Sequence, residues 1–133
     1  MKDLFNNPNI TKADRAFSNT KITTLPEFVL EGATGLTRAI GLFSNCTELK
    51  SLPERLWNDN KTYQNINLSG LFYNCNNLAG KVPNTLFKGN KEKITHLGSS
   101  IESIGTVGTS YMPNYVLGAF ANTQISCYDA EAF

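Results

Sequence analysis

Residues 42–53 read Leu42-Phe43-Ser44-Asn45-Cys46-Thr47-Glu48-Leu49-Lys50-Ser51-Leu52-Pro53, and this stretch recurs along the chain. Its first part returns at residues 16–22, 71–78 and 119–125. Its second part is an apolar residue, a proline, two variable residues and then an apolar pair. It occurs at residues 25–30, 52–57, 82–87 and 112–117. The prolines of these segments are 27, 30 and 30 residues apart. Several matches in register indicate an internal repeat.

The repeat covers nearly the whole chain, which we interpret as one domain over residues 1–133. Three copies are anchored near residues 16–41, 42–70 and 71–93. Residues 94–118 lack the repeated phenylalanine and asparagine and are interpreted as a degenerate copy, and residues 119–133 as a partial one. Because a stack of repeats leaves an apolar face at each end, we expect capping segments or neighbouring chains to cover both ends.

Each copy is expected to form one short strand followed by a short helical or 3-10 segment. The expected strands are residues 22–25, 49–52 and 78–82, lying side by side in a parallel sheet. A proline ends each strand because it has no N–H to donate, and it suits the first position of a helix whose positive end would attract Glu27 or Glu54. A period near 30 residues with these elements predicts an α/β fold, the leucine-rich-repeat solenoid.

The repeated asparagine is the most informative polar position. Asn19, Asn45, Asn74 and Asn122 each follow the repeated phenylalanine by two residues. An unpaired buried N–H costs about 1–3 kcal/mol, and an amide side chain can satisfy both a donor and an acceptor. We therefore predict a structural role, with these side chains pointing inward to bond the adjoining turn. Direct ligand contact is the alternative.

Cysteine follows that asparagine in two adjacent copies, as Cys46 and Cys75, and threonine takes the same position as Thr20 and Thr123. This exchange predicts a small, half-buried side chain rather than a metal ligand or disulfide, which are the alternatives. Zinc would lack partners, because the chain has one histidine and no Cys-x-x-Cys. Cys127 is expected to be exposed. No metal or other cofactor is predicted.

Composition and motifs argue against several function classes. The net charge of +1 provides no basic stripe for nucleic acid. No apolar run approaches the roughly 20 residues of a membrane span, and no export signal is expected within residues 1–133. His96 has no nucleophile elbow near it, the glycines at 98, 105 and 108 form no phosphate loop, and no acids are paired for glycoside hydrolysis. We predict that the protein is not an enzyme.

The stretch from Leu42 to Pro53 resembles the repeat unit of BspA-like leucine-rich-repeat proteins. The resemblance covers nearly the whole chain and is weakest at residues 90–110. It implies a right-handed α/β solenoid, and an adhesive or recognition role of the kind found in bacterial surface or secreted proteins. It also implies a protein or glycan partner and a location outside the cell, at its surface or on a virion. Similar repeats in phage-encoded proteins point to the alternative, a structural or decoration component of a virion or another large assembly.

The candidate contact residues are those that vary beside the repeated apolar positions of the expected strands. A solvated side chain without a partner is the competing interpretation for each. The candidates are Lys21, Thr23, Glu48, Lys50, Ser51, Asn77 and Lys81.

Overall fold

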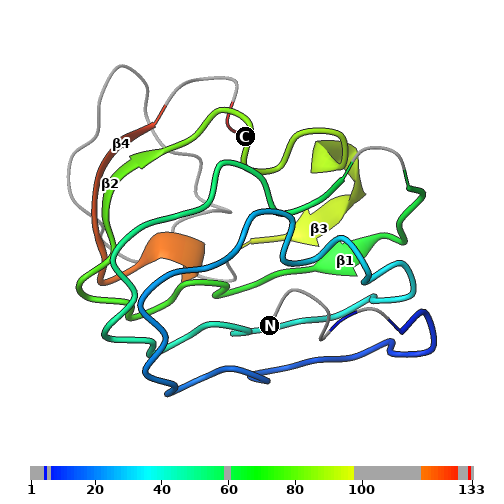
Figure 1. The fold of residues 1–133 in the computed structure, drawn as a ribbon, viewed down its shortest axis with the longest axis horizontal. Coiled ribbons are helices and arrows are strands. Elements are labelled where there is room, and N and C mark those ends of the chain that lie inside the picture. Colours follow the sequence, from blue (N-terminus) through cyan, green and yellow to red (C-terminus); the bar gives the residue numbers. More distant parts are fainter. Residues whose placement is uncertain (1–4, 6, 59–60, 98–117, 129–131, 133) are drawn as a thin grey trace.

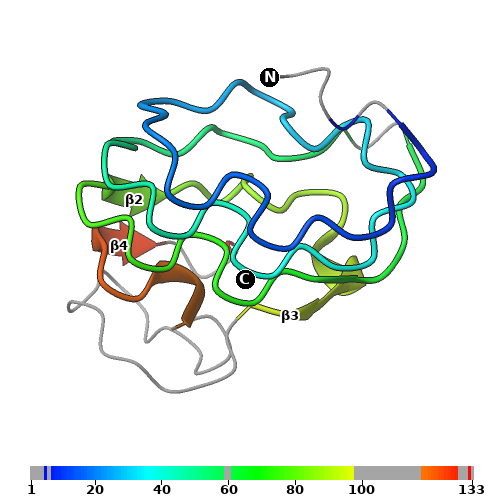
Figure 2. The ribbon, with the colours of Figure 1, turned by 90° about the horizontal axis from the view of Figure 1, so that it is seen from below.

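The chain runs through successive turns that lie side by side, as Figure 1 and the perpendicular view in Figure 2 show. The computed structural model describes residue 5 and residues 7–58, 61–97, 118–128 and 132. Most of the predicted degenerate copy, residues 98–117, lies outside the described residues, and with it the fourth proline segment.

Regular strands are few and short. β1 (Ile66–Asn67) pairs in parallel with β3 (Ile94–His96), and β2 (Ala79–Val82) pairs in parallel with β4 (Gln124–Tyr128). The 3-10 helix η2 (Lys91–Lys93) precedes β3, and residues 118–120 are helical. No helix within the described residues is long and apolar enough to cross a membrane.

Backbone hydrogen bonds join equivalent positions of neighbouring copies around the repeated phenylalanine. The Phe17 N–H donates to the Leu42 carbonyl (3.0 Å), that of Phe43 to Leu71 (3.0 Å) and that of Phe72 to Ala119 (2.8 Å). Parallel bridges from Lys12 to Arg38 and from Arg38 to Asn67 continue this row to β1. Residues 12–19, 38–45 and 67–74 are therefore aligned across three turns of the chain.

A column of stacked phenylalanine rings runs through the core beneath this row. The ring centroids of Phe17 and Phe43 are 5.7 Å apart, those of Phe43 and Phe72 5.8 Å, and those of Phe72 and Phe120 5.8 Å. Phe5, itself buried, packs edge-on against Phe17 at 5.9 Å and covers that end of the column. Offset aromatic pairs contribute about 0.5–1.5 kcal/mol each beyond the area they bury, so the column links the copies energetically.

Two of the three predicted strands do not form. β2 lies within the predicted 78–82, whereas residues 22–25 and 49–52 are not regular strands. Thr23 and Lys50 are joined by one bond, from the Lys50 N–H to the Thr23 carbonyl (3.1 Å). Each of these segments ends after four residues at a proline that cannot donate to the ladder. The segment that contains β2 is one residue longer, which leaves room for pairing with β4 before Pro83.

The prediction of a short helical segment after each proline is also wrong for the three described proline segments. Residues 27–30 and 84–87 form turns, and residues 54–57 are bent or irregular. In the segments 27–30 and 54–57, N–H groups donate to the next copy instead: Phe28 to Arg55 (3.0 Å), Leu30 to Leu56 (2.9 Å) and Leu56 to Leu86 (3.0 Å). An N–H bonded between copies cannot form the bond to residue i−4 that defines an α-helix.

Glu27 takes a different role from the one predicted at a helix end. Its carboxylate accepts the N–H groups of Glu54 (2.8 Å) and Arg55 (3.1 Å) in the next copy. The side chain therefore ties two copies together at the turn after the proline.

Candidate functional site

Each of the first three copies contains two residues with left-handed backbone, four positions apart. The later one is the repeated asparagine, with φ of 64° at Asn19, 59° at Asn45 and 61° at Asn74. The earlier one lies two residues before the phenylalanine, with φ of 62° at Gly41 and 65° at Gly70. Arg15 occupies the same position in the first copy with φ of 54°. Glycine and asparagine adopt this conformation most readily, which explains their recurrence.

The repeated asparagines therefore have a structural reason that differs from the predicted one. Asn19 and Asn122 are exposed, and Asn45 and Asn74 are half-buried, so none points into the core. The Asn74 amide donates to Asn45 Oδ1 (2.7 Å), and the Asn19 amide donates to Ser18 Oγ (3.2 Å). Asparagine recurs at this position because it tolerates left-handed backbone geometry, and not because its side chain bonds a buried turn.

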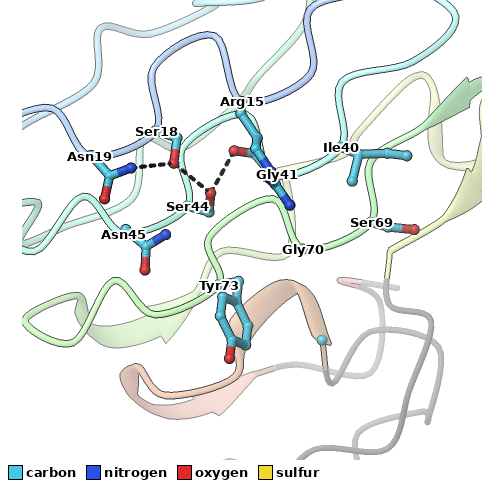
Figure 3. A pocket seen from close by; sticks show the side chains of 11 residues that line it. Arg15, Ser18, Asn19, Ile40, Gly41, Ser44, Asn45, Ser69, Gly70 and Tyr73 are labelled. Carbon is cyan, nitrogen blue, oxygen red and sulfur yellow. Dashed lines mark hydrogen bonds between the residues drawn. The ribbon is translucent and has the colours of Figure 1, made fainter.

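The left-handed positions of successive copies surround a hollow of about 360 Å³ (Figure 3). We call it the Gly41–Gly70 hollow. Its lining comes mainly from three copies and consists of small or polar residues, with one arginine, one isoleucine and one tyrosine. These residues are Arg15, Ser18, Asn19, Ile40, Gly41, Ser44, Asn45, Ser69, Gly70, Tyr73 and Gly118.

The two glycines keep this hollow open. A Cβ on Gly41 would lie 3.1 Å from Ser44 Oγ and 3.4 Å from Arg15 Cγ, and a Cβ on Gly70 would lie 3.7 Å from Tyr73 Cβ. The stem of Arg15 therefore lies directly over Gly41. Because both glycines have positive φ, any other residue there would be strained, and at Gly41 it would also be crowded.

Hydroxyl and amide groups form a short chain along one side of the hollow. Ser18 Oγ and Ser44 Oγ are 3.0 Å apart, and the Ser44 hydroxyl is also within bonding distance of the Gly41 carbonyl (2.9 Å). The Asn19 amide reaches Ser18. Figure 3 shows these three contacts as one connected run beside Arg15. Because Ser44 donates to the Gly41 carbonyl and Ser18 to Ser44, the two hydroxyl oxygens can accept from a ligand, and the second N–H of Asn19 can donate to one.

Arg15 is the one charged residue among the described residues of this lining. Its neighbour Asp14 is engaged elsewhere, because its carboxylate accepts from Arg38 Nε (2.7 Å) and from the Ile40 N–H (2.9 Å). Partial burial raises the pKa of Asp14, but the bonds from Arg38 and Ile40 outweigh it and hold that pKa below the ordinary value. The hollow therefore carries a positive charge that no acid among its described lining residues offsets.

The seven residues predicted to contact a ligand lie elsewhere. All are exposed, and none lines the Gly41–Gly70 hollow. Thr23 and Lys50 are neighbours through their backbone bond, and Asn77 donates to the Thr47 carbonyl (2.6 Å). Their role as a contact surface stays a prediction. The hollow itself was not predicted, although a glycine two residues before the phenylalanine in three copies was its signal in the sequence.

The cysteine and threonine position has a shared hydrogen-bonding role. The buried thiols of Cys46 and Cys75 donate to the carbonyls of Phe17 (3.1 Å) and Phe43 (3.0 Å) in the preceding copy. The Thr20 hydroxyl donates to Phe17 itself (2.8 Å), and the Thr123 hydroxyl to Phe120 (2.7 Å).

Each of the three thiols is free, and Cys127 is half-buried rather than exposed as predicted. The neighbouring Cys46 thiol and burial together raise the pKa of the Cys75 thiol. Among the described residues no group of three or more histidine, cysteine or acidic side chains could hold a metal ion.

His96, the chain's one histidine, is exposed at the end of β3, and its Nδ1 lies 3.0 Å from Thr95 Oγ1.

Comparisons of the chain with protein-family models, with curated proteins and with solved structures found no match.

Proposed function

We propose that the chain is a non-enzymatic recognition module that binds a protein or a glycan through the surface of a leucine-rich-repeat solenoid of the BspA-like type. Such a module would act in adhesion outside the cell or at its surface. The in-register rows of hydrogen bonds and the column of phenylalanine rings support a stack of equivalent turns.

The observation that carries the proposal is the Gly41–Gly70 hollow. Equivalent positions of several copies combine there to form one concave surface with hydroxyl, amide, guanidinium and phenol groups. Its volume lies within the range of about 300–1,000 Å³ that is typical of small-molecule sites. A stacked repeat presents such a surface without a catalytic residue, because neighbouring turns supply the side chains in a fixed order.

The proposal is tested by probing the purified chain against an array of glycans and against immobilised extracellular matrix proteins. We expect saturable binding to at least one class of ligand. Tyr73→Ala should weaken this binding if the hollow is the site. Lys50→Ala and Ser51→Ala should weaken it if the seven predicted contact residues form the site. The melting temperature of each variant controls for loss of fold. Absence of saturable binding to both classes would refute the recognition role.

The alternative is a structural component of a virion or another large assembly, and one observation favours it. Six apolar side chains that pack against the core are only partly buried, and four of them lie in residues 10–22, at one edge of the stack: Ile10, Ala13, Phe17 and Ile22. Docking against another subunit would remove this apolar area from water. Light scattering at increasing protein concentration distinguishes the two functions, because an assembly component should associate through this edge and Ile10→Ser should prevent it.

A further inference from the structure

We propose that the Gly41–Gly70 hollow binds an acidic saccharide, a sugar that carries a carboxylate. The guanidinium of Arg15 would pair with that carboxylate, and the ring of Tyr73 would pack against the sugar. This inference rests on the proposed recognition function and names the class of ligand.

Charge is the first argument. Arg15 is exposed, its stem lies over Gly41, and none of the described residues that line the hollow is acidic. The nearest acid along the chain, Asp14, is paired with Arg38. A guanidinium without a lining acid favours an anion, and its planar fork matches the two oxygens of a carboxylate.

The remaining polar groups suit the hydroxyls of a sugar. The Ser44 hydroxyl donates to the Gly41 carbonyl, so the Ser18 hydroxyl donates to Ser44 and the Asn19 amide donates to Ser18. Both hydroxyl oxygens can still accept a hydrogen bond from a ligand, and the second N–H of Asn19 can donate one. Asn45 uses its Oδ1 to accept from Asn74, and its NH₂ group can donate to a ligand. A sugar hydroxyl likewise donates and accepts, so several of these contacts can form at once.

Tyr73 supplies an aromatic surface on which the C–H groups of a sugar ring can pack. It is half-buried and lies at the rim opposite Arg15 in Figure 3. An aromatic ring with a polar tip packs against the C–H groups of a sugar ring while its hydroxyl bonds outward. An acidic peptide is a poorer fit, because Ile40 alone among the described lining residues has an aliphatic side chain, and a single such side chain forms no apolar pocket.

The test measures binding by titration calorimetry with the methyl glycosides of glucuronic acid and of N-acetylneuraminic acid. Methyl glucoside is the neutral control. We expect the wild-type chain to bind at least one acidic glycoside more tightly than the neutral one. Arg15→Gln should weaken that binding by about ten- to a hundredfold, the loss of a charge-assisted hydrogen bond, whereas Arg15→Lys should retain part of it.

Tyr73→Ala should weaken the binding of acidic and neutral glycosides alike. Lys88→Gln is the matched control, since it removes an exposed cation that lies outside the hollow and outside the predicted contact residues, and it should leave binding unchanged. Equal affinity for acidic and neutral glycosides with no effect of Arg15→Gln would overturn the inference, and so would loss of acidic binding in Lys88→Gln alone.

The two proposals fail in different ways. If the chain binds a neutral glycan or a protein but none of the acidic glycosides, the acidic-saccharide site is refuted and the recognition function stands. If the chain binds nothing in either experiment, both are refuted. Melting temperatures of Arg15→Gln and Tyr73→Ala within a few degrees of the wild type ensure that lost binding reflects the hollow rather than unfolding.

Discussion

Replacing Asn45 by alanine or by glycine distinguishes the two reasons for an asparagine at this position. Asn45 has φ of 59°, is half-buried, and accepts one hydrogen bond from Asn74 at 2.7 Å. Alanine removes the hydrogen bond and must also adopt a left-handed backbone, which costs an L-residue roughly 1–2 kcal/mol. Glycine removes the same hydrogen bond but adopts the conformation without strain.

The expected difference follows from these terms. The lost hydrogen bond, about 0.5–1.5 kcal/mol, affects both variants equally. Glycine also makes the unfolded chain more flexible, which offsets about 0.4–1 kcal/mol of its advantage. We therefore expect Asn45→Gly to be more stable than Asn45→Ala by about 0.5–1 kcal/mol, or roughly 2–5 °C in melting temperature.

Urea and thermal unfolding followed by circular dichroism measure this difference. Asn65→Ala is the control, because Asn65 is exposed and has no positive φ, and it should unfold within about 0.5 kcal/mol of the wild type. A glycine variant as unstable as the alanine variant would show that the side chain matters and the backbone conformation does not. Equal stability of Asn45→Ala and Asn65→Ala would contradict the structural role altogether.

Further predictions concern the core, the pH dependence and the thiols. Phe43→Ala should lower the free energy of unfolding by about 3–5 kcal/mol, and Phe17→Ala by less because its ring is half-buried, as urea titrations will measure. The pKa of Asp14 is lowered on folding, so its carboxylate stabilises the protein above the unfolded value near 3.8 and this contribution disappears as the pH falls through the folded pKa. Asp14→Asn should therefore lower the melting temperature at pH 7 but not at pH 2, and an equal loss at both would contradict this. A thiol reagent should modify native Cys127 before Cys75, because Cys75 is buried and has a raised pKa; peptide mass spectrometry reversing that order would contradict it.

The sequence by itself determined which positions recur and which of them are apolar. Phe17, Phe43 and Phe72 recur in the same context, and their rings stack in one column. Burial depends on the character of each side chain, so a periodic pattern of apolar residues carries this information without knowledge of the fold.

Tertiary structure decided where the backbone hydrogen bonds go. Phe28 and Leu30 donate to the next copy rather than within a helix, because the distance between neighbouring turns brings those carbonyls within reach. The repeat pattern is the same for either outcome, so a short helix and a stacked turn could not be told apart from it.

The candidate site likewise depends on the stack. Arg15, Gly41 and Gly70 are far apart along the chain and line one hollow only because equivalent positions of successive copies lie side by side. The sequence shows that glycine recurs before the phenylalanine, but the concave surface exists only once several turns are placed against one another.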